Sequence, residues 1–158
     1  MRVPVALPVF GGALMGRLRA TDYRGFYELL QEQIAGYSGE FDDILLLVPD
    51  FFRLLTNLLE DARVPKNARL LISAAIAYFV APYDVQPEEV YGPLGYLDDL
   101  FLCTFVLREL RSSIPDEVIK GAWEAEFDLD QIADSVYEKS RESLGDKTDA
   151  ILHYVGLR

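Results

Sequence analysis

Two stretches of the chain are apolar on every side at helical spacing, and they constrain the fold more than any other feature. The first, NARLLISAAIAYFVAPY, follows Lys66, and the second runs from Leu97 to about Leu110. A helix without a polar face is stable only where other helices surround it. We therefore predict a central antiparallel helix pair, joined by the segment 81–96 and surrounded by amphipathic helices.

The rest of the chain carries the start and stop signals of shorter helices, such as Pro at first positions and Gly after last ones. No stretch alternates apolar and polar residues with β-branched enrichment, so no strand is predicted. The fold class is all-α, a compact bundle of about five to seven helices. The expected outer helices are 22–35, 49 to before 65, 115–123, one capped by Asp128 or Asp130, and 147–155.

Length and composition indicate a single core. The chain has 158 residues, of which 51% are hydrophobic, as in a folded domain rather than a disordered segment. Residues 1–20 are expected to form an apolar and basic N-terminal arm, because they include three arginines and no acid, and residues 21–158 to form one helical domain.

The charge balance bears on the partners that the chain can take. Twenty-six acids against fifteen bases give a formal charge of −11. This field repels nucleic acid and anionic membrane surfaces, so no nucleic-acid partner is expected. The uncharged run from Leu70 to Tyr83 is shorter than the roughly 18 to 20 residues that a bilayer-spanning helix needs. A membrane-associated helical hairpin stays as an alternative, carried by the two apolar helices.

Cys103 is the single cysteine and lies within the apolar run 100–107. A lone cysteine forms no intramolecular disulfide, and a thiol in such a run is typical of a buried structural residue. The apolar N-terminal stretch superficially resembles a signal peptide, but Pro4 and Pro8 interrupt it. We therefore expect a cytoplasmic protein.

The connection between the two apolar helices is strongly acidic. It carries five carboxylates and no Lys, Arg or His between Ala81 and Leu100: Asp84, Glu88, Glu89, Asp98 and Asp99. In one interpretation these side chains cap helix N-termini. In the other, Asp84, Glu88, Asp98 and Asp99 bind a hard cation, Mg²⁺, Ca²⁺ or Mn²⁺, because oxygen ligands without imidazole or thiolate suit those ions. No other cofactor is predicted.

No catalytic residue is assigned. Gly92 and Gly95 lack the Gly-Lys-Ser/Thr ending of a phosphate-binding loop, and His153 is a lone imidazole in the last helix. No nucleophile with its base is recognisable in the sequence. No motif therefore predicts an enzyme. The one catalytic alternative is a metal site formed by the carboxylates of the loop.

The same connection identifies a family resemblance. Residues 61–102 resemble the YkvA-like family of domains of unknown function, in which an apolar helix ends in a Pro-x-Asp turn and the next begins after Gly-x-x-Asp-Asp. The matching residues are Pro82, Asp84, Pro87, Gly95, Asp98 and Asp99. The resemblance covers about 49–115, although Gln86, Glu88 and Glu89 depart from the usual loop. It implies a helical core and no particular activity, and some members of the family are thought to be membrane-associated.

Taken together, these features predict a non-enzymatic protein-interaction or scaffold module that uses the acidic loop 81–99. Its partner is expected to be another protein or a second copy of the chain. The alternatives are a divalent-metal-dependent enzyme centred on Asp84, Asp98 and Asp99, and the membrane-associated hairpin.

Overall fold

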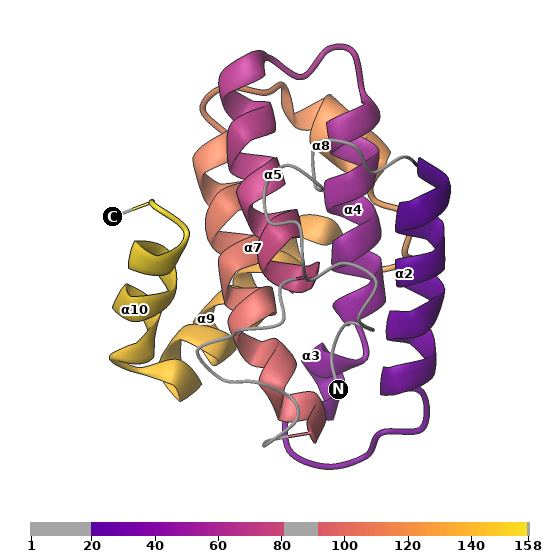
Figure 1. The fold of residues 1–158 in the computed structure, drawn as a ribbon, viewed down its shortest axis with the longest axis vertical. Helices are drawn as coiled ribbons and strands as arrows, with labels where there is room; N and C mark the ends of the chain where they lie inside the picture. The colour runs from indigo at the N-terminus through magenta and orange to yellow at the C-terminus, as the bar shows by residue number, and fades with distance from the viewer. Residues whose placement is uncertain (1–19, 81–91, 158) are drawn as a thin grey trace.

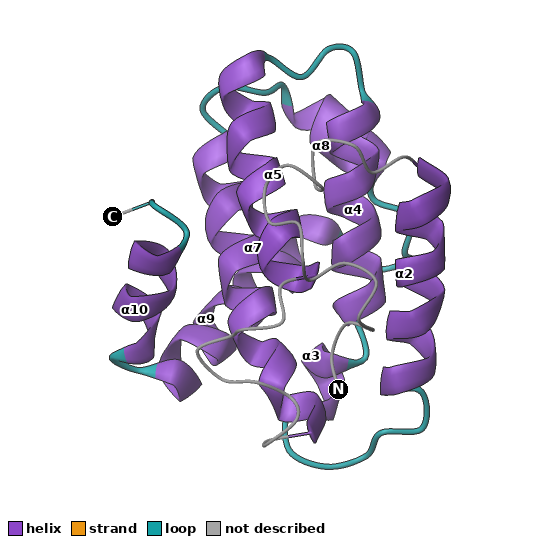
Figure 2. Cartoon of the chain, in the orientation of Figure 1, coloured by secondary structure: helices purple, strands orange, loops and turns teal. Residues whose placement is uncertain are grey.

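The computed structural model describes residues 20–80 and 92–157, and these form helices and connecting turns without a strand among them (Figure 2). The helices are α2 (Ala20–Ile34), α3 (Asp42–Leu45), α4 (Val48–Glu60), α5 (Lys66–Val80), the 3₁₀ helix η2 (Gly92–Tyr96), α7 (Leu97–Leu110), α8 (Asp116–Ala122), α9 (Leu129–Leu144) and α10 (Lys147–Tyr154).

The bundle is built around α5 and α7, which run antiparallel beside α4 (Figure 1). α2 packs against α4, and α8 also contacts α4. α9 lies along α7, and the short α10 rests against both α7 and α9. The prediction of an all-α bundle around a central apolar pair is confirmed.

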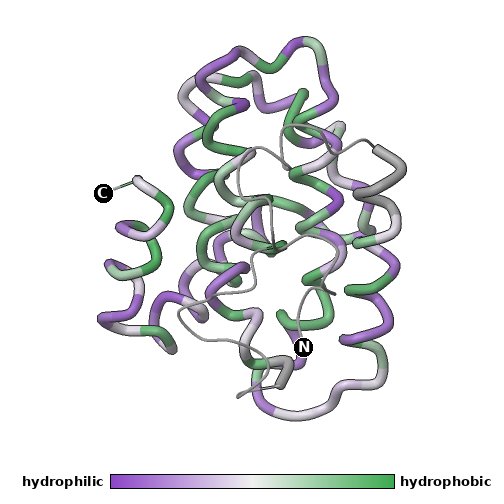
Figure 3. The backbone as a smooth tube through the Cα atoms, in the orientation of Figure 1, coloured by the Kyte–Doolittle hydropathy of each residue, from purple (hydrophilic) through white to green (hydrophobic). Residues whose placement is uncertain are grey.

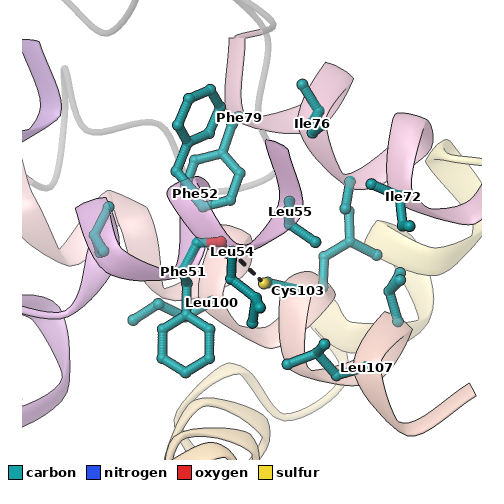
Figure 4. Packing of buried hydrophobic residues seen from close by; sticks show 14 of the residues in the cluster. Phe51, Phe52, Leu54, Leu55, Ile72, Ile76, Phe79, Leu100, Cys103 and Leu107 are labelled. Atoms are coloured by element: carbon teal, nitrogen blue, oxygen red, sulfur yellow. Dashed lines mark hydrogen bonds between the residues drawn. The ribbon is translucent and has the colours of Figure 1, made fainter. Parts of the chain in front are cut away.

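The core is a continuous apolar cluster drawn from these helices, and the apolar segments of the chain gather at the centre of the fold (Figure 3). The rings of Phe26, Phe52 and Phe79 form a series across α2, α4 and α5, with centroid separations of 4.9 and 5.3 Å. Cys103 is fully buried beside Phe51 and Leu100 (Figure 4). The expectation of a buried structural thiol is therefore confirmed.

The expectation that α5 is buried on all sides is wrong for one face. Leu70 is 64% exposed, and Ser73, Ala74 and Ala77 are half-buried. The reason is that, among the described helices, α5 packs mainly on α4 and α7, which cover only part of its surface. The outer face of α5 is therefore uncharged but partly exposed.

Local signals set the helix ends. The side chain of Asp128 caps α9 by accepting a hydrogen bond from the N–H of Asp130 at 2.9 Å. Gly145 and Gly156 end α9 and α10 with positive φ angles of 56° and 81°, a conformation that glycine adopts without strain. Arg69 at the start of α5 donates to carbonyls at the end of α4, including that of Asp61 at 2.7 Å, and so fixes the α4–α5 hairpin.

Among the described helices, none combines the length and the apolar character required to cross a bilayer.

Candidate functional site

The described end of the acidic loop is the 3₁₀ helix η2, which leads directly into α7. Tyr96 closes this turn and is buried in the apolar core. Its hydroxyl donates a hydrogen bond to the side-chain oxygen of Gln33 on α2. The loop thus ends at a point that is fixed to a neighbouring helix.

Asp98 occupies the first turn of α7 and is 0% exposed. Its Oδ2 accepts a hydrogen bond from the Tyr78 hydroxyl at 2.8 Å, and its Oδ1 accepts one from the N–H of Asp99 at 3.0 Å. The second bond satisfies a backbone N–H of the first helical turn, and the first one joins α7 to the last turn of α5. Asp98 therefore both stabilises a helix start and links the two helices that flank the loop.

Asp99 lies beside Asp98 and is 1% exposed. One helical turn further along α7 is the thiol of Cys103, whose Sγ is 3.9 Å from the carbonyl oxygen of Phe51. Burial raises the pKa of the Cys103 thiol far above its ordinary value of 9.0, and the negative charge of Asp99 raises it further. The thiol is accordingly protonated at neutral pH, which makes it a poor nucleophile and a poor metal ligand.

The structure places only part of the predicted site. Asp98 and Asp99 lie together in the first turn of α7. Asp84, Glu88 and Glu89 fall outside the described residues, so their convergence with Asp98 stays a prediction. Within residues 20–80 and 92–157, no three His, Cys, Asp or Glu side chains gather in a group that could hold a metal ion.

Sequence reasoning missed Tyr78 as a partner of the loop. It stands in the apolar run of α5 and reads there as one more core aromatic. A general rule could have indicated that it has a polar partner. The hydroxyl of a buried tyrosine needs a hydrogen bond, and the paired aspartates at the start of the other apolar helix are acceptors. His153, to which the sequence analysis assigned no catalytic role, lies exposed in the last turn of α10.

Comparisons with known proteins give a family without an assigned activity. The model of a family described as a protein of unknown function, DUF1232, matches residues 68–105. The uncharacterised protein ORF9 of Methanothermobacter thermautotrophicus is 34% identical over 129 residues, which cover 82% of this chain and 88% of that protein.

A second relative is a longer protein. The E3 ubiquitin-protein ligase RNF170 of Xenopus laevis is 30% identical over 119 residues, which cover 66% of this chain and 42% of that protein. The chain thus corresponds to less than half the length of the ligase. No solved structure matches the chain.

Proposed function

This chain belongs to the family of the archaeal protein ORF9 and carries a DUF1232 domain at residues 68–105, and from that premise we propose that it is a non-enzymatic protein-interaction or scaffold module. Its binding element is the acidic loop 81–99. The partner is another protein that presents basic side chains, because the loop contains five carboxylates and no base.

The observation that carries the proposal is the hydrogen bond between Tyr78 and Asp98. It joins the last turn of α5 to the first turn of α7, so the chain leaves one helix and enters the next at points that are fixed relative to each other. A binding segment held at both ends loses less conformational freedom when a partner engages it. The carboxylates left for a partner are then those of Asp84, Glu88 and Glu89.

The two relatives support a modular role. The parts similar to this chain make up 88% of ORF9 and 42% of RNF170. Similarity that covers most of one protein and a minor part of another is what a domain that can be joined to other domains produces. The ubiquitin-ligase activity in the name of RNF170 is a property of that protein.

Charge reversal in the loop tests the proposal. Glu88→Lys with Glu89→Lys is compared with Glu28→Lys and Glu32→Lys, which make the same charge change on the exposed face of α2. Partners captured from cells are identified by mass spectrometry, purified and bound again to each variant. We expect at least one protein to bind the wild-type chain and the α2 variant but not the loop variant.

If every recovered protein binds the loop variant as well as it binds the wild-type chain, the loop is not the binding element. Equal melting temperatures of the three proteins show that the comparison concerns binding and not folding.

The second candidate is a divalent-metal-dependent enzyme centred on Asp84, Asp98 and Asp99. The observation that favours it is the burial of two adjacent carboxylates, Asp98 and Asp99, at 0% and 1% exposure. Carboxylates removed from water are stable only with hydrogen bonds, a shared proton or a cation. Mg²⁺, Ca²⁺ or Mn²⁺ would suit such oxygen ligands.

A further inference from the structure

The outer face of α5 is apolar along its whole length beyond the first turn. No charged residue stands between Arg69 and the end of this helix at Val80. Leu70 on this face is 64% exposed, and Ala74 and Ala77, which follow it at helical spacing, are half-buried. The helix that lies at the centre of the bundle thus presents an uncharged strip of surface.

The exposed faces of the other long helices are different. Glu32 on α2, Glu109 on α7 and Glu138 on α9 are exposed carboxylates. A helix surface that meets water normally carries such polar side chains, whereas an apolar one is typical of a face that another segment covers. The composition of α5 therefore indicates a covering segment over Leu70.

The N-terminal arm has the chemistry of such a segment. Residues 1–19 precede the described part of α2 and lie outside the described residues. Residues 3–16 contain no charged side chain and include the large apolar residues Leu7, Phe10 and Leu14. The arm also supplies three arginines and no acid, whereas the chain as a whole has a charge of −11. Electrostatic attraction therefore favours a position of the arm against its own domain.

The arm is long enough to reach this face. α2 and α5 both pack on α4, and their first residues lie at the same end of the bundle (Figure 1). At most two helix spacings of about 8 to 10 Å each separate the two helices, a total of about 20 Å that about six extended residues span. Leu70 and Ala77 are about 11 Å apart along α5. The arm therefore has enough further residues to run along the whole exposed face.

A second copy of the chain suits the face less well. A standard protein interface buries about 800 Å² on each partner. On α5, Leu70 is the one large apolar side chain that is strongly exposed, and its neighbours on the face are small. An attached segment needs far less contact area, because its connection to the domain gives it an effective concentration in the millimolar range.

We propose that residues 3–16 pack on the outer face of α5 of the same chain and cover Leu70, Ala74 and Ala77. The arm is then an apolar strap that withdraws this face from other partners. The face belongs to the segment 68–105 that matches the family model, whereas the strap comes from residues outside that match. This contact does not involve the loop 81–99, so its failure would leave the proposed function untouched.

Photo-cross-linking of the full chain tests the contact. A photoreactive benzoyl-phenylalanine replaces Leu70, and ordinary and isotope-labelled chains are mixed before illumination. Trypsin cuts after Arg2 and Arg17 and so releases residues 3–17 as one peptide, whose cross-links mass spectrometry locates. We expect cross-links from α5 to this peptide in which both parts carry the same isotope. The same group in place of Phe127, which is 60% exposed between α8 and α9, should not reach the arm.

Two results of this experiment overturn the proposal. Cross-links that join an ordinary chain to a labelled one would show that a second copy occupies the face. The absence of any cross-link between α5 and residues 3–17 would show that the arm does not lie there.

Proteolysis measures whether Leu70 holds the arm. Elastase cleaves after small apolar residues, which the arm supplies, and cleavage of a docked segment follows the fraction of time that it is released. Leu70→Asp places a charge against the apolar arm, so we expect cleavage within residues 3–16 to become about tenfold faster. Phe127→Asp, the matched change at another exposed apolar residue, should leave the rate at the wild-type value.

Equal helical circular dichroism of the three proteins shows that the bundle is intact in each. A cleavage rate within the arm that is the same in the wild-type protein and in Leu70→Asp contradicts the proposal. So does an acceleration that Phe127→Asp produces to the same extent.

Discussion

A buried carboxylate is stable only where protein donors replace the water it has lost, and Asp98 shows how this chain meets that condition. The hydroxyl of Tyr78 and the N–H of Asp99 both donate to it. The first of these bonds also links α5 to α7, whereas the second lies within α7. The burial of Asp98 therefore requires the hydrogen bond from Tyr78, and that bond holds the two helices at the ends of the loop together.

Replacing Tyr78 by Phe should therefore destabilise the protein. The change removes one donor from a fully buried carboxylate and leaves the ring in place, so we expect a loss of about 1 to 3 kcal/mol in the free energy of unfolding. Urea denaturation measures it. Tyr154→Phe is the matched control, because that ring is half-exposed and packs edge-on against Tyr78 at 5.8 Å; its effect should stay below about 0.5 kcal/mol. Equal losses in the two variants would contradict the role of the Tyr78 hydroxyl.

Cys103 gives a prediction for the pH dependence of stability. Burial, and then the charge of Asp99, raise the pKa of this thiol above its ordinary value of 9.0. Below that value the thiol is protonated in both states. Above it the unfolded chain loses the proton and the folded chain keeps it, so stability falls as pH rises, by at most about 1.4 kcal/mol per pH unit.

Urea denaturation between about pH 8 and about pH 10 tests this effect, because the range spans the ordinary thiol pKa. The free energy of unfolding should fall more steeply for the wild-type protein than for Cys103→Ala, which lacks the titrating group. Parallel slopes in the two proteins would show that the thiol does not contribute.

At the level of elements, sequence patterns were informative where the local signal is strong. The apolar character of α5 and α7 follows directly from their composition, and Asp128, Gly145 and Gly156 mark helix ends through their own conformational preferences. The short α3 was missed, because Asp42–Leu45 has no periodicity of its own and follows Phe41 in a left-handed conformation with φ 62°. The exposure of Leu70 was missed because composition shows which residues are apolar, not how many neighbours surround a helix.

The cap of α9 provides a test at this scale. Asp128→Ala should reduce the free energy of unfolding by about 1 kcal/mol, whereas Asp128→Asn, which still accepts the hydrogen bond of Asp130, should cost only a few tenths. Asp146→Ala is the control, since Asp146 precedes α10 without a side-chain capping bond. Thermal unfolding monitored by circular dichroism compares the three. A loss for Asp146→Ala as large as that for Asp128→Ala would argue against a specific cap.

For the whole molecule, the bundle was predictable and the full candidate site was not. Helical periodicity and the absence of alternating patterns determine the fold class, because each element buries its apolar face against the others. The site depends on contacts between residues far apart in sequence, such as Tyr78 with Asp98 and Tyr96 with Gln33. Such pairs carry no local signature. The two proposed functions differ in where they need Asp84 and Glu88. A metal site requires these carboxylates to converge on Asp98, and a protein-binding loop does not.

The central claim is that the acidic loop binds protein partners rather than a metal ion, and thermal unfolding with Mg²⁺, Ca²⁺ or Mn²⁺ tests it most directly. A cation bound at a hundred times its dissociation constant stabilises the folded state by about 2.7 kcal/mol, which raises the melting temperature by several degrees. We predict that none of the three ions shifts the melting temperature beyond the effect of sodium chloride at equal ionic strength. A shift of several degrees specific to one ion, abolished by both Asp84→Asn and Asp98→Asn, would contradict the claim and favour the metal-dependent enzyme.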